Sequence, residues 1–403
     1  MKPSLQETIQ IISMENADLK VHFHNALTAF RADPAFALSP AVREWFARGS
    51  GEVILLGTTN YSQAVALELG EAFKISAVVD DFRHGKGFQF CGLPIITSRE
   101  FSKRAGDKSL LAINGCRFDY SRRYFEELCR YNSINVLNFE QAVRLSGIRC
   151  RDHRSADWGQ HIASHADAYF NLLDKLVDGY SRDTLLCVLL FHLTCNKEWH
   201  LHVARPYSTL YFRSGLWSPG RNESFVDCGA SSGESTTALV DLTGGNFKKI
   251  WMIEPDRLNV ETLNKFISNL HKTLPGRIQL HACALGKEEC SLPFAHLGGY
   301  DGHLLACTEK TDPDSLVPVR TLDKLIDGAP TLIKLDIEGA ELDALKGGCG
   351  LISRYRPKIC ASAYHRAEDI LTLTDYVGAL CDDYRIGLRH QGEDRFDTCL
   401  YFY

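Results

Sequence analysis

The chain has 403 residues, of which 45% are apolar and 24% are charged, and its net charge at pH 7 is −5. This composition is ordinary for a folded protein, and the length predicts two or three domains. The acidic balance argues against nucleic acid or an anionic membrane as the main partner, because proteins that bind them usually carry a basic excess.

The 14 cysteines include no C-x-x-C pair and no zinc-site spacing, and many lie within apolar segments, as buried reduced thiols do. Residues 1–20 lack the charged-then-apolar pattern of a signal peptide. The longest strongly apolar segment, Leu185 to Leu193, is too short to span a bilayer. We therefore expect a soluble, cytoplasmic protein.

The first 150 residues divide into two parts. Residues 1–48 show helical spacing of apolar side chains, interrupted near Pro34 and Pro40, and predict an N-terminal helical cap. In residues 49–150 strands and helices alternate, which predicts a small Rossmann-like α/β domain with a parallel sheet. Its predicted strands are 53–56, 75–79 and 109–113.

Residues 151–220 predict a helical connector, and residues 221–403 a second α/β domain. Helices are expected between the first five strands of this domain. The last two strands, joined through the polar turn His390 to Arg395, should pair antiparallel. This mostly parallel sheet with an antiparallel end is the Rossmann-like sheet of class I methyltransferases. Its seven predicted strands are 225–227, 250–254, 278–283, 332–336, 358–363, 385–388 and 398–402.

The second domain opens with the segment Phe225-Val-Asp-Cys-Gly-Ala-Ser-Ser-Gly-Glu-Ser-Thr236. An apolar strand leads into a glycine-containing turn and a helix, and the next strand ends on Glu254, 21 residues beyond Gly233. This arrangement is typical of open α/β sheets that bind a nucleoside-containing cofactor, with the acidic residue on the ribose hydroxyls. The alternative is that the two glycines make a tight turn and Glu254 caps a helix.

The turn departs from the dinucleotide fingerprint, because Ser231 stands where the second glycine would be and Asp227 precedes the turn. The Asp227 carboxylate would repel a pyrophosphate but tolerate a cationic ligand. S-adenosylmethionine (SAM) carries ammonium and sulfonium charges, so we expect SAM as the cofactor. Tyr207, Tyr211 and Phe212 could close over it or simply belong to the core.

Acidic residues follow the predicted strand 332–336. Asp336 and Glu338 stand at its carboxyl end and could position or deprotonate an acceptor, whereas Glu341 suits the N-terminus of a helix. His365 ends the next strand and could serve as general base. Asp336, Glu338 and His365 could also hold a divalent cation. Such sites need more oxygen ligands than these residues supply, so we expect no metal.

At this point the chain resembles the FkbM family of SAM-dependent methyltransferases over about residues 207–403. The resemblance rests on the 227–236 turn, Glu254-Pro255, Arg320-Thr-Leu-Asp323, the segment Ile333-Lys-Leu-Asp-Ile-Glu-Gly-Ala-Glu341, Tyr364-His365 with Glu368-Asp369, and Asp397-Thr-Cys-Leu-Tyr401. It implies O-methylation of a hydroxyl on a sugar, glycan or polyketide-like small molecule.

The resemblance also implies a set of site residues. Expected cofactor contacts are Asp227, Gly229, Ala230, Gly233, Thr236, Glu254 and Asp336. Expected catalytic residues are His365, Glu338 and Asp336. Which of them acts as the base stays open.

Two other functions are compatible with the pattern: a nicotinamide-dependent oxidoreductase, and a non-catalytic nucleotide-binding protein. The acceptor loop is expected between Pro293 and Pro313, with Tyr300 and His303. The N-terminal α/β domain could bind a nucleotide-linked substrate, hold an acceptor or mediate dimerisation, and we favour recognition or interaction. A small-molecule or carbohydrate acceptor and possible homo-oligomers complete the expected partners.

Overall fold

The computed structural model describes residues 16–48, 51–68, 70, 73–146, 155–270, 276–299, 302–304 and 315–403. The first 15 residues of the predicted cap, Tyr300 and residues 305–313 of the predicted acceptor loop therefore lie outside the described residues. The chain forms two compact units, one of residues 1–166 with 185–204 and the other of residues 167–184 with 205–403. No described helix is both long and apolar enough to cross a membrane.

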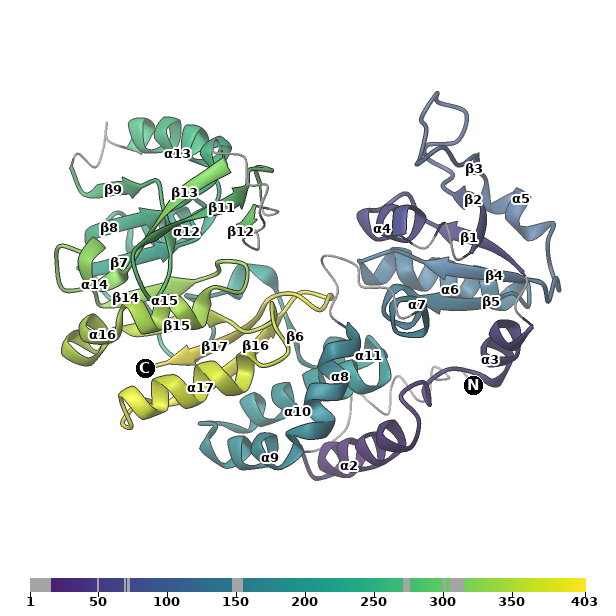
Figure 1. Ribbon diagram of the computed structural model, residues 1–403, viewed down its shortest axis with the longest axis horizontal. Coiled ribbons are helices and arrows are strands. Elements are labelled where there is room, and N and C mark those ends of the chain that lie inside the picture. The colour runs from purple at the N-terminus through teal and green to yellow at the C-terminus, as the bar shows by residue number, and fades with distance from the viewer. Residues whose placement is uncertain are drawn as a thin grey trace. The chain divides into compact units, whose positions relative to one another are not determined.

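The first unit contains a five-stranded sheet in the order β3-β2-β1-β4-β5, with all neighbours parallel (Figure 1). Two of its strands, β3 and β5, are short and have no counterpart among the predicted ones. The strands are β1 (Glu52–Leu56), β2 (Lys74–Val79), β3 (Ile95–Ile96), β4 (Leu110–Asn114) and β5 (Asn135–Asn138). Helices accompany the strands: α4 (Asn60–Glu68), α5 (Ser98–Ser102), α6 (Asp119–Tyr131) and α7 (Phe139–Ser146).

The remaining helices of the N-terminal half lie before the first sheet and in the predicted connector. Two precede the sheet, α2 (Asn16–Ala32) and α3 (Pro40–Ala47), on either side of the expected interruption. The others are α8 (Ser155–Ser164), α9 (Ala166–Lys175), α10 (Gly179–Thr194) and α11 (Glu198–Val203). These helices are divided between the two units, with α9 and the start of α10 mostly in the second.

The second unit is built on a sheet in the order β6-β16-β17-β15-β14-β7-β8-β9. Neighbours from β15 to β9 are parallel, and β17 pairs antiparallel with both β15 and β16. The strands are β6 (Ala204–Arg205), β7 (Glu223–Cys228), β8 (Phe247–Ile253), β9 (Ile278–His281), β14 (Leu332–Leu335), β15 (Lys358–Ser362), β16 (Ile386–Gln391) and β17 (Thr398–Phe402). The sheet has eight strands instead of the expected seven, because the two-residue β6 joins its edge.

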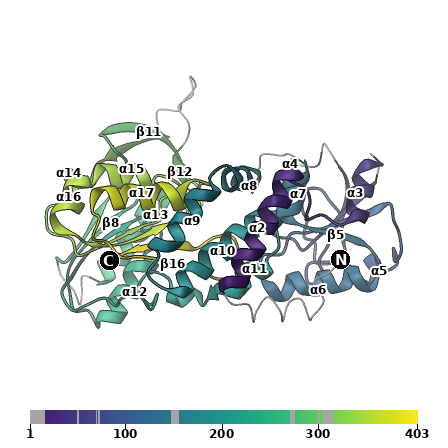
Figure 2. The ribbon, with the colours of Figure 1, turned by 90° about the horizontal axis from the view of Figure 1, so that it is seen from below.

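The helices of this unit are α12 (Glu234–Thr243), α13 (Arg257–Leu270), α14 (Leu322–Leu325), α15 (Glu341–Gly347), α16 (Cys349–Tyr355) and α17 (Asp369–Leu380), with a one-turn 3₁₀ helix at Tyr207–Thr209. Figure 2 shows α15, α16 and α17 together on one side of the sheet and α12 on the other. The expectation of a helix between β9 and β14 was incomplete. A second sheet, β10-β13-β11-β12, stands there ahead of the short α14. Its strands are β10 (Ala284–Leu285), β11 (Cys290–Ala295), β12 (His303–Leu304) and β13 (Leu316–Arg320).

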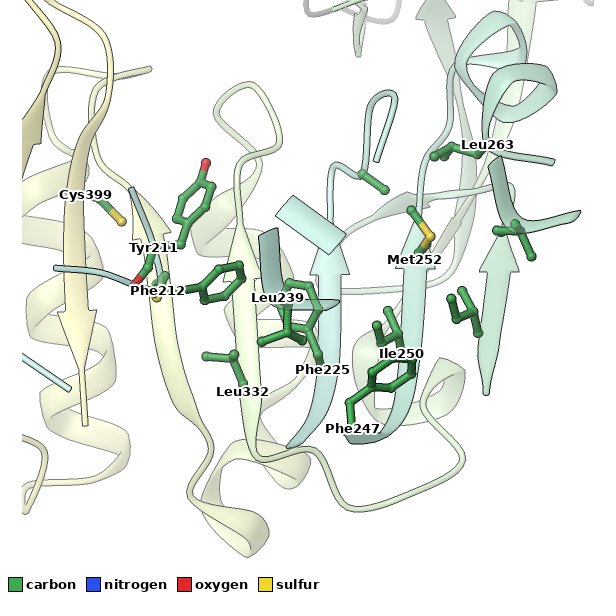
Figure 3. Packing of buried hydrophobic residues seen from close by; sticks show 14 of the residues in the cluster. Tyr211, Phe212, Phe225, Leu239, Phe247, Ile250, Met252, Leu263, Leu332 and Cys399 are labelled. Atoms are coloured by element: carbon green, nitrogen blue, oxygen red, sulfur yellow. Dashed lines mark hydrogen bonds between the residues drawn. The ribbon is translucent and has the colours of Figure 1, made fainter. Parts of the chain in front are cut away.

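The hydrophobic core beneath the central strands shows which side chains of these strands share a face. Phe225 of β7, Ile250 and Met252 of β8, and Leu332 of β14 are fully buried on one face, where Leu239 of α12 packs against them (Figure 3). Residues two apart in a strand share a face, so the side chains two positions after Phe225 and Leu332 also point to this side. These are Asp227 and Lys334, which are partners in the parallel register of β7 and β14.

The polar turn predicted before the last strand begins later in the chain than expected. His390 and Gln391, expected in the polar turn before β17, belong to β16 and are fully buried. The strand accommodates them because His390 Nδ1 lies 2.9 Å from the hydroxyl of Thr398 on β17. Burial lowers the pKa of His390 to about 4, so its imidazole is neutral and fits an interior position.

Candidate active site

A pocket opens at the carboxyl ends of β7, β8 and β14, within the second unit, and encloses about 900 Å³ of open space that is partly continuous with solvent. The expected residues Gly229, Ala230, Glu254, Asp336 and Glu338 all line it. The inserted sheet supplies the opposite wall through Leu285, Phe294, His303 and Leu304. Phe294, His303 and Leu304 belong to the segment Pro293 to Pro313 that was expected as the acceptor loop. The strands of this wall were not predicted, because they are short and two of them contain a proline, Pro293 and Pro318.

The turn after β7 brings its backbone against the end of β14. Gly229 has φ +79°, and a Cβ at this position would lie 1.9 Å from the carbonyl oxygen of Asp336. Only glycine meets both conditions, because it has no side chain and tolerates positive φ. The floor of the pocket is therefore formed by two backbones in direct contact.

Glu254 follows β8 and faces the same turn. Its carboxylate oxygens accept one hydrogen bond each, from the Ser231 amide at 2.8 Å and the Asp256 amide at 2.9 Å. Burial raises the pKa of Glu254, and these two hydrogen bonds oppose that shift. A carboxylate oxygen has a second lone pair, so both oxygens can still accept from a ligand. The group is fixed in place and suited to a vicinal diol.

Three expected cofactor residues lie behind the pocket lining. Asp227 is fully buried, and one of its oxygens accepts hydrogen bonds from Ser235 at 2.6 Å and Thr236 at 2.8 Å. Gly233 is the N-cap residue of α12, against the ring of Phe266. In the structure Asp227 and Thr236 bind each other, so both hold the turn and the start of α12 in position.

Lys334 is the charged partner that sequence reasoning missed. Its Nζ donates to the Gly229 carbonyl at 2.5 Å and to the Cys228 carbonyl at 3.2 Å. It also lies 3.4 Å from Oδ1 of Asp227, the oxygen that does not bind Ser235 and Thr236. Burial opposes the charge of Lys334, but Asp227 and then Asp336 outweigh it and raise the pKa. The register of β7 and β14 creates this ion pair, since it sets the two residues opposite each other.

Asp336 is held as an anion at the bottom of the pocket. It accepts hydrogen bonds from the hydroxyl groups of Tyr211 at 2.8 Å and Tyr364 at 3.0 Å. Burial would raise its pKa, but the charges of Lys334 and His365 prevail and lower it. Tyr211, expected either over the cofactor or in the core, is buried and also lines the pocket.

His365 lies behind Asp336 and Glu338, surrounded by three carboxylates. Its Nε2 is 3.6 Å from an oxygen of each of these two acids, and its Nδ1 is 3.0 Å from Glu341. Burial lowers the pKa of His365, but Glu341, Glu338 and Asp336 overcome this and raise it to about 10. The imidazole is therefore protonated near neutral pH, which argues against the expected role of His365 as general base and favours a role as a fixed cation.

Oxygen and nitrogen atoms of Asp336, Glu341 and His365 lie within 4.8 Å of one another, close enough to surround a metal ion. The expected set of Asp336, Glu338 and His365 differs from it by one acid. Glu341, which we expected only to stabilise a helix, contacts the imidazole and also accepts a hydrogen bond from the Ile337 amide at 2.8 Å.

The charge on His365 predicts how stability changes with pH. Because its pKa is raised from 6.5 to about 10, its ion pairs contribute fully below pH 6.5 and are lost as pH rises toward 10. We expect the free energy of unfolding to exceed that of a His365→Asn variant at pH 6, and the difference to shrink by pH 10. Urea unfolding of both proteins at pH 6, 8 and 10 measures this. A difference that is constant across the range would contradict a charged His365.

Comparisons with known proteins bear on the family of the chain. The model of the FkbM methyltransferase domain matches residues 227–384. The crystal structure of methyltransferase FkbM from Methylobacillus flagellatus KT is 42% identical, with a TM-score of 0.87, and the match covers 96% of this chain and 100% of that one. No curated protein shows a significant match to the chain.

Other solved structures are much more distant. An rRNA methylase from Streptococcus thermophilus is 13% identical with a TM-score of 0.27, covering 45% of this chain and 87% of its own. Fibrillarin from Aeropyrum pernix, with natively bound S-adenosyl-L-methionine, is 13% identical with a TM-score of 0.28, covering 47% and 70%. Likeness at this level says nothing about the reaction, whereas the match along the whole Methylobacillus protein does. The chain belongs to the FkbM family of methyltransferases.

Proposed function

We propose that the protein is a SAM-dependent O-methyltransferase that acts on a hydroxyl group of a sugar, glycan or polyketide-like small molecule. The observation that carries the proposal is the placement of Gly229, Glu254 and Asp336 around one pocket at the carboxyl ends of three adjacent parallel strands. Ligands of open α/β sheets bind at this edge.

The residues present fit the cofactor. The Gly229 turn packs directly against the Asp336 backbone, which brings both to the floor of the pocket, and Glu254 keeps lone pairs for the two ribose hydroxyls. Asp336 offers a carboxylate, and Tyr211 an aromatic ring, to a positively charged ligand. SAM would supply an activated methyl group, so the protein has mainly to hold the acceptor oxygen in line with it.

We assign the proton-accepting role to Glu338. It lines the pocket beside Asp336, and its side chain is 43% exposed. Its carboxylate lies 3.6 Å from Nε2 of the protonated His365, which helps to fix its position. Asp336, which already accepts from two tyrosines, holds the cofactor side of the site.

The acceptor would occupy the end of the pocket formed by the inserted sheet. Phe294 and Leu304 give this wall an apolar surface, and His303 adds a polar ring. A mixture of apolar and hydrogen-bonding groups suits a hydroxylated small molecule. Transfer of a labelled methyl group from SAM to a panel of sugars and polyketide alcohols tests this class. Products that are ethers support it, and methylation confined to amines or carboxylates would contradict it.

Glu254→Ala should weaken binding of S-adenosylhomocysteine (SAH) about 10- to 100-fold, because two hydrogen bonds to a charged acceptor are lost. The matched control is Glu261→Ala on the exposed side of the adjacent helix α13, for which affinity should not change. Calorimetric titration of both variants with SAH measures the difference. Equal affinity for the two would remove Glu254 from the cofactor site.

Glu338→Gln should lower kcat about 10²- to 10⁴-fold while SAH affinity stays within a small factor, since a base acts on the acceptor and not on the cofactor. Asp343→Asn serves as the control, since Asp343 is an acid of α15 whose side chain is 51% exposed. The measurement is methyl transfer to the best acceptor of the panel. Unchanged turnover in Glu338→Gln would exclude it as the base.

A further inference from the structure

The chain that leaves β11 reaches from the inserted sheet to the cofactor end of the pocket. Residues 296–299, with the sequence His-Leu-Gly-Gly, follow β11 directly, and we call them the strap. Gly299, the last residue of the strap, lines the same pocket as Ser231, Glu254 and Asn259. The strap therefore borders the end of the pocket where Glu254 is proposed to bind the ribose.

Asn259, in the first turn of α13, binds the strap from the side of the main sheet. Its side chain pairs with the Gly299 backbone in both directions: Oδ1 accepts from the amide at 2.9 Å, and Nδ2 donates to the carbonyl at 2.8 Å. Asn259 is only 7% exposed, so water competes little for these two hydrogen bonds. The pair fixes the end of the strap against α13.

Ser231, in the turn after β7, binds the same carbonyl group of the strap. Its hydroxyl donates to the Gly299 carbonyl at 3.2 Å, and its amide donates to the Glu254 carboxylate at 2.8 Å. A continuous series of hydrogen bonds thus leads from Glu254 through Ser231 and Gly299 to Asn259. The strap and the proposed ribose-binding acid are held by one network.

Hydrogen bonds, rather than apolar packing, hold residues 297–299. Leu297 is 60% exposed, and the two glycines that follow it have no side chain. The amide of Gly298 donates to Oδ2 of the fully buried Asp256 at 2.8 Å. A segment with few buried apolar contacts opens locally at a low cost in free energy. The strap can therefore open without unfolding the sheet behind it.

We propose that Asn259 is a positioning residue for the cofactor, which keeps the strap closed over the nucleoside end of the pocket and slows the release of bound SAM or of its product SAH. The inference rests on the proposed binding of SAM in this pocket. Asn259 acts through Gly299, and Ser231 acts through the same carbonyl group. The two side chains therefore stabilise one closed state of the strap.

The test is the rate of SAH release from the full chain, measured by surface plasmon resonance. Asn259→Ala removes two hydrogen bonds, each worth a factor of about five, so release should be roughly tenfold faster or more. Asn264→Ala is the matched control, since Asn264 is an exposed asparagine of the same helix. Its release rate should equal that of the unaltered chain, and circular dichroism should show both variants folded.

Ser231→Ala separates an action through the strap from a general weakening of the site. It removes one hydrogen bond to the Gly299 carbonyl, so release should be about fivefold faster. In the double variant with Asn259→Ala, release should be hardly faster than in Asn259→Ala alone, because the strap is already open. Effects that multiply in the double variant would show that the two residues act independently, and would overturn the proposal.

The proposed cofactor and the strap can fail separately in this experiment. Failure of SAH to bind the unaltered chain contradicts the proposed cofactor, and the strap with it. Normal binding to the unaltered chain, with equally slow release from Asn259→Ala and Asn264→Ala, overturns the role of Asn259 alone and leaves the proposed methyl transfer standing.

Discussion

Lys334→Met should lower the free energy of unfolding by about 3–5 kcal/mol, because it leaves the buried carboxylate of Asp227 without its cation. The same substitution removes the donor to the Gly229 and Cys228 carbonyls, so the cofactor turn loses its support from β14. Lysine and methionine have similar lengths, and the change in packing is small. Urea unfolding measures the loss.

Lys324→Met is the control for this experiment. Lys324 is 68% exposed and its ion pair with Glu289 lies at the surface, so its removal should cost less than about 1 kcal/mol. The double variant Lys334→Met with Asp227→Asn should recover part of the loss, since no unpaired charge stays in the core. A loss below 1 kcal/mol in Lys334→Met, or no recovery in the double variant, would show that the buried pair does not support the turn.

Gly229→Ala should abolish measurable SAH binding. The new Cβ would stand 1.9 Å from the Asp336 carbonyl oxygen, so β14 and the turn after β7 would have to separate at the floor of the pocket. The positive φ of this residue adds a backbone cost of about 1 kcal/mol. Calorimetric titration with SAH on protein shown to be folded measures the effect.

Gly392→Ala separates the two causes. Gly392 has a similar φ of +76°, but nothing lies within 4 Å of its Cβ position. This variant should lose about 1 kcal/mol of stability and bind SAH normally. If Gly229→Ala binds SAH as well as Gly392→Ala does, the contact between the two backbones is not needed for the cofactor.

The edge of the sheet where the site forms was predictable, because strand ends are marked in the sequence. Buried runs end at Asp227, Glu254 and Asp336, and the carboxyl ends of neighbouring parallel strands meet at one edge. The prediction combined these strand ends with the glycine-containing turn after the first strand and with the resemblance to the FkbM family. It brought Gly229, Glu254, Asp336 and Glu338 to one pocket, as the structure shows.

What could not be predicted depends on contacts between distant segments. The Lys334–Asp227 pair requires the register of β7 and β14, which no local pattern encodes. The charge of His365 depends on Glu341, which stands three residues after Glu338 and was expected only to suit the start of a helix. The inserted sheet was not predicted, because β10 and β12 have only two residues each, too few to show an alternation of apolar and polar side chains.

The most direct test of the central claim is calorimetric titration of SAH into the purified full chain, alone and with NADH present. We expect one SAH per chain with an affinity that NADH does not change, because Glu254 and the Gly229 turn form a site for a cationic nucleoside, with the Asp336 carboxylate in its wall. No binding of SAH, or its displacement by NADH, would contradict the assignment of this pocket to SAM.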